Sequence, residues 1–419
     1  MSHSAETTSI GTEEAGIGQP VLVDDRTAKR NVIVLATAQA IAGAGGPINF
    51  SISSLAAHML LGSDKSLSTL PLTAFVVGTA IGTVPAALLQ RTFGRRLGLI
   101  AGMLVGAGGA LLEATAMAFA SFPLLCLGAF LMGFTAAFVQ QFRFAAADTA
   151  SPTFRPKAIS LVLIGGIFAA IIGPQTVIHT KNAWPLVPFA APYLAAAGLM
   201  ILAALVLTTL HAPRPAAGHR RHGGRPLTAI LVQPRFLVAV ACAIISYALM
   251  NLMMTAAPLA MVWCGLPEEA AFLGIQWHVI AMFAPSFFTG TLIARYGSER
   301  VVAAGLILLL VCAAIALTGI DLLHFWGALV VLGIGWNLGF LGATALVATT
   351  YEPEERERVQ GFNDLLVFGA VAVASFSSGR ILVAGGWSAV AWTVIPIAAL
   401  PLVGLLILLA VQKRRAVRS

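Results

Sequence analysis

Residues 87–96 read ALLQRTFGRR, and residues 290–299 read GTLIARYGSE. Superimposing these two segments matches Gly94 with Gly297, 203 positions further along the chain. Two other pairs have the same offset: Arg155 with Arg358, and Gly166 with Gly369. Agreement of three registers on different segments is typical of an internal duplication. The sequence therefore predicts two similar halves, each a six-helix unit.

The composition indicates that both halves lie in a membrane. Of the 419 residues, 58% are hydrophobic and only 10% are charged, and the mean hydropathy is +0.90. A soluble domain carries about 25% charged residues, so this chain could not cover its own surface with solvated groups. Soluble and disordered proteins are thereby excluded. The cysteines lie apart in apolar runs without CxxC or histidine spacing, so we expect no disulfide framework, no metal site and no cofactor.

Twelve apolar runs are long enough to cross the bilayer, which takes about 20 residues of helix. They cover residues 32–58, 67–90, 97–119, 122–147, 157–178, 191–211, 235–262, 270–293, 300–320, 326–350, 362–383 and 388–411. The predicted fold class is an all-α integral membrane protein with twelve transmembrane helices in two pseudo-symmetric six-helix bundles.

The longest polar segment between spans divides the runs six and six and sets the domain boundaries. We expect a disordered cytoplasmic tail at 1–30, an N-terminal bundle at 31–211, a cytoplasmic linker at 212–234, a C-terminal bundle at 235–411 and a basic cytoplasmic tail at 412–419.

The basic residues predict the orientation of these spans. Almost all Lys and Arg fall in the termini and in the loops on one side, whereas the opposite loops hold only Lys65 and Lys181. By the positive-inside rule both termini are cytoplasmic. We expect a multi-pass protein of the bacterial inner membrane, in contact with the lipid bilayer and monomeric. Because the positive charge is explained by topology, no nucleic-acid partner is expected.

The loop after the second span resembles the signature of the major facilitator superfamily, G-x-x-x-D-R-x-G-R-R. Gly94, Arg95 and Arg96 match its end, while Ala87 stands at the leading glycine and Arg91 at the acid. Gly94 permits a tight turn, and Asp148 at the inner end of span 4 is the expected partner of Arg95. Since the acid that latches span 11 in the family is missing, Asn363 or Asp364 is expected to cap that helix instead.

A second resemblance lies in span 5, where Gly173 and Pro174 match a Gly-Pro motif of facilitator antiporters. A proline inside a membrane helix frees a backbone carbonyl, and a glycine lets a neighbouring helix approach closely. The motif is therefore consistent either with antiport or with helix packing alone.

The resemblance implies that spans 1, 4, 7 and 10 line a central cavity. Each carries polar residues at membrane depth, where they are costly unless they face water, a ligand or another helix. The candidate substrate-binding residues are Gln39, Asn49, Gln140, Arg143, Tyr247, Asn251, Trp336 and Asn337. Glycines and a proline at 43–47 should break span 1 near mid-depth. The alternative for any one amide is a hydrogen bond between helices.

Two ionisable residues inside the spans are candidates for coupling transport to a proton. His278 has an ordinary pKa near neutrality, so it can load and release a proton in the physiological range. Glu113 is a carboxyl in apolar surroundings, which favour its protonated form. Arg143 is a candidate for attracting an anionic or carbonyl-bearing substrate, and Arg380 is the fourth intramembrane charge.

These features predict a secondary active transporter of a small organic solute that works by alternating access and is coupled to protons. The chain as a whole resembles a bacterial branch of facilitators that includes riboflavin importers, which implies uptake of riboflavin or a similar flavin. The alternatives are efflux of drugs or metabolites by proton antiport, and a receptor or scaffold that transports nothing. An enzyme is not expected, and the sequence has no GxxxxGK[ST] loop for ATP drive.

Overall fold

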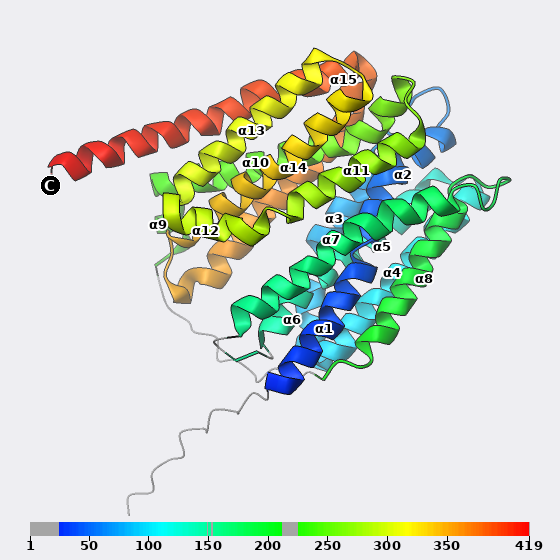
Figure 1. Cartoon of the computed structure of the whole chain (residues 1–419), viewed down its shortest axis with the longest axis horizontal. Coiled ribbons are helices and arrows are strands. Elements are labelled where there is room, and N and C mark those ends of the chain that lie inside the picture. The colour runs from blue at the N-terminus through cyan, green and yellow to red at the C-terminus, as the bar shows by residue number, and fades with distance from the viewer. Residues whose placement is uncertain (1–24, 149, 152–153, 212–224, 419) are drawn as a thin grey trace, which may run out of the picture.

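The computed structural model describes residues 25–148, 150–151, 154–211 and 225–418, and this part of the chain is helical without strands (Figure 1). The first bundle comprises α1 (Asp25–Ala42), α2 (Gly45–Leu60), α3 (Leu70–Phe93), α4 (Arg95–Ala118), α5 (Phe122–Gln140), α6 (Phe142–Asp148), α7 (Arg155–Thr180) and α8 (Ala190–Leu207). The second comprises α10 (Pro234–Trp263), α11 (Glu268–Phe283), α12 (Ser286–Tyr296), α13 (Ser298–Thr318), α14 (Leu322–Ala348) and α15 (Arg356–Arg418). The short α9 (Leu227–Leu231) and the 3-10 turn η1 (Pro353–Glu355) complete the described elements.

All twelve predicted spans fall on helices, and three of them are broken. Span 1 divides into α1 and α2 at the predicted break. Span 4 divides into α5 and α6 at Gln141, and span 8 is the pair α11 and α12, bent by 41° before Ser286. The tail predicted at 1–30 and the linker predicted at 212–234 lie largely outside the described residues.

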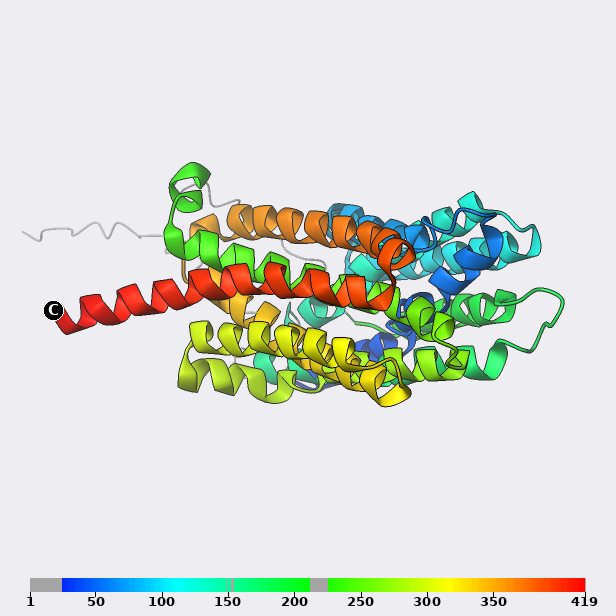
Figure 2. The ribbon, with the colours of Figure 1, turned by 90° about the horizontal axis from the view of Figure 1, so that it is seen from above.

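The last two spans are joined in α15. Arg358–Val411 comprises 54 residues of helix. At a rise of about 1.5 Å per residue a straight helix of this length would be about 80 Å long, whereas the hydrocarbon core of a membrane is about 30 Å thick. Gly386 interrupts it at φ 71° and ψ −170°, values that a residue with a side chain rarely adopts. The chain reverses there, so that the two parts of α15 run in opposite directions (Figures 1 and 2). Ten of the described helices are long and apolar enough to cross a membrane, and the bent pair α11 and α12 makes an eleventh crossing. Dividing α15 at Gly386 gives the twelfth, as predicted.

The helix pairings confirm the two similar halves. In the first bundle α1 packs on α7 and α5 packs on both α3 and α4; in the second, α10 packs on α15 and α14 packs on both α11 and α13. The glycines matched by sequence also share a conformation: Gly94 has φ 85° and ψ 159°, and Gly297 has φ 84° and ψ 152°. Each separates two helices at the same point of its bundle.

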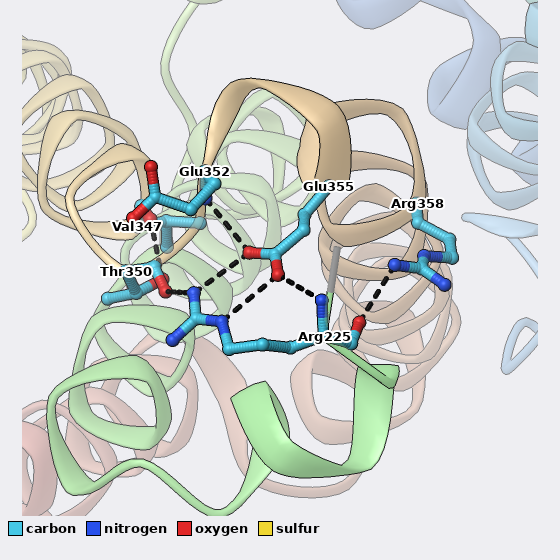
Figure 3. Close-up of polar contacts among 6 residues, drawn as sticks. All are labelled: Arg225, Val347, Thr350, Glu352, Glu355 and Arg358. Atoms are coloured by element: carbon cyan, nitrogen blue, oxygen red, sulfur yellow. Dashed lines mark hydrogen bonds and ion pairs between the residues drawn. The ribbon is translucent and has the colours of Figure 1, made fainter. Parts of the chain in front are cut away.

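The described end of the linker is fastened to the second bundle (Figure 3). The Glu355 carboxylate, 1% exposed, accepts the backbone N–H of Arg225 at 2.6 Å and its guanidinium at 2.8 and 3.0 Å. Arg225 also donates to the carbonyl of Thr350, and Arg358 donates to the carbonyl of Arg225. At the other end of the linker, the Asn31 side chain bonds both backbone groups of His211. Each end is thus held by its own bundle.

This arrangement predicts a pH-dependent contribution to stability. Hydrogen bonds from Arg225 lower the pKa of Glu355 to about 2, from an ordinary value of 4.5. A pKa that is lower in the folded state means that the carboxylate stabilises the fold above pH 4.5, and that this stabilisation is lost as the pH falls toward 2. We expect Glu355→Gln to lower the Tm of the purified protein at pH 7. The difference in Tm between wild type and this variant should become smaller below pH 4.5.

Thermal unfolding in detergent between pH 7 and pH 3 measures both effects. Glu352→Gln is the matched control, because Glu352 is an exposed acid three residues away whose carboxylate acts on Arg225 through its charge but makes no hydrogen bond to the described residues of this cluster. If the difference in Tm between wild type and Glu355→Gln were as large at pH 3 as at pH 7, the proposed role of the Glu355 carboxylate would be contradicted.

Candidate substrate-binding cavity

The two bundles meet along four helix pairs and enclose a cavity. The pairs are α2 with α10, α2 with α11, α7 with α11 and α3 with α15. The cavity encloses about 1090 Å³ of empty space, including the part that is open to solvent. Spans 1, 4 and 7 contribute to its wall, together with spans 2, 5, 6, 8 and 11. Span 10 was also expected in the wall, but none of its described residues lines the cavity.

Four of the predicted residues line this cavity with polar groups. Gln39 and Gln140 belong to the first bundle, and Tyr247 and Asn251 to the second. The side chains of Gln39 and Gln140 make no hydrogen bond to any described residue. The side chain of Asn251 accepts one long hydrogen bond, from the Thr255 hydroxyl at 3.3 Å. These groups remain available to a ligand. The other polar lining residues, Thr79 and Thr135, donate their hydroxyls to backbone carbonyls.

The rest of the wall is apolar and rich in methionine and phenylalanine, a composition that was not predicted from the sequence. Five methionines and four phenylalanines contribute to it: Met132, Met200, Met250, Met254, Met282, Phe50, Phe75, Phe283 and Phe368. Thioethers adapt their shape and make favourable contacts with aromatic rings. The signal that could have identified them is the run around Asn251, ALMNLMMT at 248–255, where methionines flank the amide. None of the described residues in this wall is an acid, a base or a histidine.

Three other predicted substrate-binding residues lie behind the wall. Trp336 is 7% exposed, stacks on Phe340 with ring centroids 5.5 Å apart and packs on Tyr247 at 5.4 Å. Asn49 is fully buried, donates to the carbonyl of Gly45 and accepts from Ser53. Neither contributes to the lining.

Asn337 is the third, and it bridges the bend between α11 and α12. Its amide donates to the carbonyl of Met282 and to the hydroxyl of Ser286, both at 2.7 Å, and accepts from Thr289 at 2.6 Å. These bonds satisfy groups that the interrupted helix leaves without partners. The geometry is that of an interhelical bond, which was the alternative for each amide.

The two predicted proton-coupling residues are both fully buried, one in each bundle. Glu113 on α4 lies beside Asn49 and close to Tyr193, whose hydroxyl is 3.0 Å from that of Ser53. Neither carboxyl oxygen of Glu113 has a hydrogen-bond partner of normal geometry among the described residues. His278 on α11 has Nδ1 2.7 Å from the carbonyl of Leu329, while its Nε2 has no such partner.

The two remaining intramembrane charges are exposed. Arg143 lies on α6 with its guanidinium 4.8 Å from the ring centre of Phe144, and it interacts electrostatically with Asp364 and Tyr247. Arg380 lies on α15, 5.7 Å from the ring centre of Phe376.

The loop motif forms the contact expected of it, but the expected cap is wrong. Arg95 pairs with Asp148, its predicted partner, and donates to Gln90 at 2.9 Å, while Arg96 is exposed. Asn363 and Asp364 lie inside α15, which begins at Arg356. Residues 356–361 continue the helix ahead of the apolar run, so neither side chain stands at the helix end, where capping operates.

The Gly-Pro motif of span 5 lies against the break in span 1. A Cβ at Gly173 would come within 2.7 Å of the Pro47 Cβ and 2.8 Å of the Ala44 carbonyl oxygen. Gly173 therefore allows α7 to touch the start of α2, while Pro174 continues inside α7. Helix packing accounts for the motif.

Side-chain contacts between the bundles gather at the end that the charge pattern assigns to the outside. Lys181 pairs with Glu268 at 2.9 Å and with Glu269 at 2.7 Å. Gln175 donates to Gln276 at 2.9 Å, and Ser375 accepts the Thr73 hydroxyl at 3.2 Å. His58 and Trp263 pack edge to face, with ring centroids 5.5 Å apart. These contacts close one end of the cavity.

Known proteins similar to this chain are transporters. The family model described as Major Facilitator Superfamily matches residues 33–284 and 275–419. The riboflavin transporter RfnT of Brucella anthropi is 49% identical over 390 residues, which cover 92% of this chain and 97% of that protein. The uncharacterized MFS-type transporter YdeG of Bacillus subtilis is 30% identical over 379 residues, 86% of this chain and 87% of its own.

The same likeness extends to a solved structure. The in meso crystal structure of the POT family transporter PepTSo has a TM-score of 0.70 at 13% identity, covering 93% of this chain and 99% of that one. At this identity the likeness concerns the fold alone, and it agrees with the predicted fold class.

Proposed function

Because this chain belongs to the major facilitator superfamily, we propose that its central cavity binds riboflavin or a closely related flavin and that the protein carries it across the membrane by alternating access. The family consists of secondary transporters and not of enzymes, as the sequence predicted. The substrate is inferred from the cavity and from the likeness to the riboflavin transporter of Brucella anthropi.

The observation that carries this proposal is the chemistry of the cavity wall. A flavin ring is flat, uncharged and largely apolar on its faces, with carbonyl and N–H groups along one edge. Methionine and phenylalanine side chains suit the faces, and the amides of Gln39, Gln140 and Asn251 suit the edge. Because the polar groups come from both bundles, a bound ligand would touch both, as alternating access requires.

Two further features support alternating access. The contacts from Lys181, Gln175 and Thr73 join the bundles at one end, and the cavity lies on the other side of them. With the termini cytoplasmic, as the charge pattern predicts, this is a state open toward the inside. We place the protein in a bacterial inner membrane, as a monomer in the lipid bilayer.

We further propose that transport is coupled to protons through Glu113 and His278. Glu113 supports this because it is a fully buried carboxyl without a hydrogen-bond partner of normal geometry among the described residues, a position where the neutral form is favoured. His278 supports it because its Nε2, the atom at which this imidazole would take up a proton, has no hydrogen-bond partner among the described residues. Both lie behind the cavity wall, so a proton would act through helix movement and not by touching the flavin.

Efflux by antiport has less support. Its local sequence argument was the Gly-Pro motif, and the close approach of Gly173 to Pro47 accounts for that motif by packing. A receptor or scaffold would not need uncommitted amides in a cavity shared by the bundles.

Uptake of labelled riboflavin into proteoliposomes tests both proposals separately. We expect saturable uptake that unlabelled riboflavin inhibits, and a stimulation by an inward pH gradient that a proton ionophore abolishes. Glu113→Gln should remove the stimulation while leaving exchange of riboflavin at equal pH. Absence of any riboflavin flux would overturn the substrate, whereas flux that is indifferent to the pH gradient would overturn the coupling alone.

A further inference from the structure

The charges nearest to the cavity lie just beyond its wall, one on each bundle. Asp364 precedes the lining residue Phe368 by four positions in α15, and Val371 also lines the cavity, so all three share one helix face. Arg143 follows the lining residue Gln140 by three positions, across the break between α5 and α6. Each charge therefore stands one turn from the wall, toward the end opposite the contacts of Lys181.

These two charges lie on different bundles, beside the same end of the cavity. Both are solvent-exposed, and they interact electrostatically with each other, while Arg143 also interacts with Tyr247. Tyr247 lies in the wall and packs against Phe368, with ring centroids 5.8 Å apart. A chain of neighbours thus joins Arg143 to Asp364 around the mouth.

The wall itself offers a phosphate hydrogen-bond donors but no cation. None of the described residues that line it carries a positive charge. Placing an ionised phosphate there without a paired cation is costly, because its hydration is lost and not replaced. Arg143, three positions beyond the lining residue Gln140, is a cation beside the cavity, and a guanidinium is well suited to phosphate. The negative charge of the Asp364 carboxylate opposes the positive charge of Arg143, and the two groups interact electrostatically.

We propose that Asp364 neutralises Arg143 at the mouth, so that the transporter accepts the uncharged flavin and rejects its phosphate ester. This inference rests on the proposed flavin site. A phosphate directed into the cavity meets an uncharged wall. A phosphate directed toward the mouth meets a cation whose field is cancelled by the opposed carboxylate. Asp364 is thus a specificity-determining residue that repels an anionic substrate and offsets the charge of the cation that would attract it.

Binding of riboflavin and of riboflavin 5′-phosphate to the purified full-length protein tests this, with flavin fluorescence as the signal. In wild type we expect the phosphate ester to bind about a hundredfold more weakly. In Asp364→Asn we expect its affinity to rise about tenfold, the effect of one charge-assisted hydrogen bond, with riboflavin affinity nearly unchanged. The double variant Arg143→Gln, Asp364→Asn should lose this gain, and 1 M salt should reduce it by screening.

Glu352→Gln is the matched control, because it removes one exposed carboxylate that precedes Asp364 by twelve residues and does not line the cavity. Unchanged discrimination in Asp364→Asn, or a gain that persists without Arg143, would overturn the inference while riboflavin still binds. Equal binding of both flavins to wild type would also overturn it. If wild type binds neither flavin, the proposed function fails instead. Should Asp364→Asn not fold, the exchanged pair Arg143→Asp, Asp364→Arg must keep the wild-type discrimination.

Discussion

Oxidation of a Thr73→Cys, Ser375→Cys variant is expected to stop riboflavin transport, and a reducing agent is expected to restore it. Thr73 on α3 and Ser375 on α15 belong to different bundles, and their side-chain oxygens lie 3.2 Å apart at the closed end of the cavity. Sulfur atoms at these positions are near enough to bond after a small movement of the helices. A disulfide there holds the closed end shut, so the cavity cannot open to that side.

The measurement is uptake in proteoliposomes as a function of the cross-linked fraction. The four native cysteines, Cys126, Cys242, Cys264 and Cys312, are first replaced by alanine. The matched control is Leu308→Cys with Gly335→Cys, which joins α13 to α14 within one bundle, where a Cβ at Gly335 lies 3.1 Å from that of Leu308. Uptake should fall in proportion to cross-linking in the first variant only. Full transport by the oxidised protein would contradict alternating access at this interface.

Asn251→Leu is expected to lower the affinity for riboflavin about ten- to a hundredfold while leaving the Tm almost unchanged. Asn251 lines the cavity, is 2% exposed and makes one long hydrogen bond, accepted from Thr255. Leucine has a similar volume, so the fold loses little. The flavin loses a hydrogen bond and leaves one of its own polar groups buried without a partner, which costs about 1–3 kcal/mol.

Asn337→Leu is the matched control, with the opposite result expected. It removes three hydrogen bonds at 2.6–2.7 Å that join α14 to the bend between α11 and α12. We expect a loss of about 1–3 kcal/mol in the free energy of unfolding, with flavin affinity unchanged in the protein that remains folded. Binding isotherms and thermal unfolding of both variants separate the two roles. Weakened binding in Asn337→Leu at an unchanged Tm would assign that residue to the cavity.

The sequence predicted the spans well because their signals are local. Length and apolar composition located the helices, the glycines and proline at 43–47 predicted the break in span 1, and Gly94 with Gly297 indicated the duplication. The pairing of Arg95 with Asp148 followed from position, since the span boundaries put both residues at the same end of the bundle.

The direction that each polar residue faces could not be predicted in this way. A membrane helix that is apolar on every side does not reveal its rotation, so an amide facing a cavity and an amide facing another helix look alike. Asn251 and Asn337 differ in role for this reason. Likewise, the apolar runs located Glu113 and His278 inside spans but did not show that both lie behind the cavity wall. The methionines of the wall lie in apolar runs, where composition alone does not distinguish them from residues that face lipid or another helix.

The final part of α15 is longer than the membrane is thick. From the kink at Gly386, residues 387–418 continue as helix over about 48 Å, against about 30 Å of hydrocarbon, and this segment extends past the neighbouring helices (Figures 1 and 2). The end of this helix therefore lies roughly 18 Å clear of the hydrocarbon. A fluorescent reporter attached to that end of the helix would lie beyond both bundles and would leave their motion unhindered.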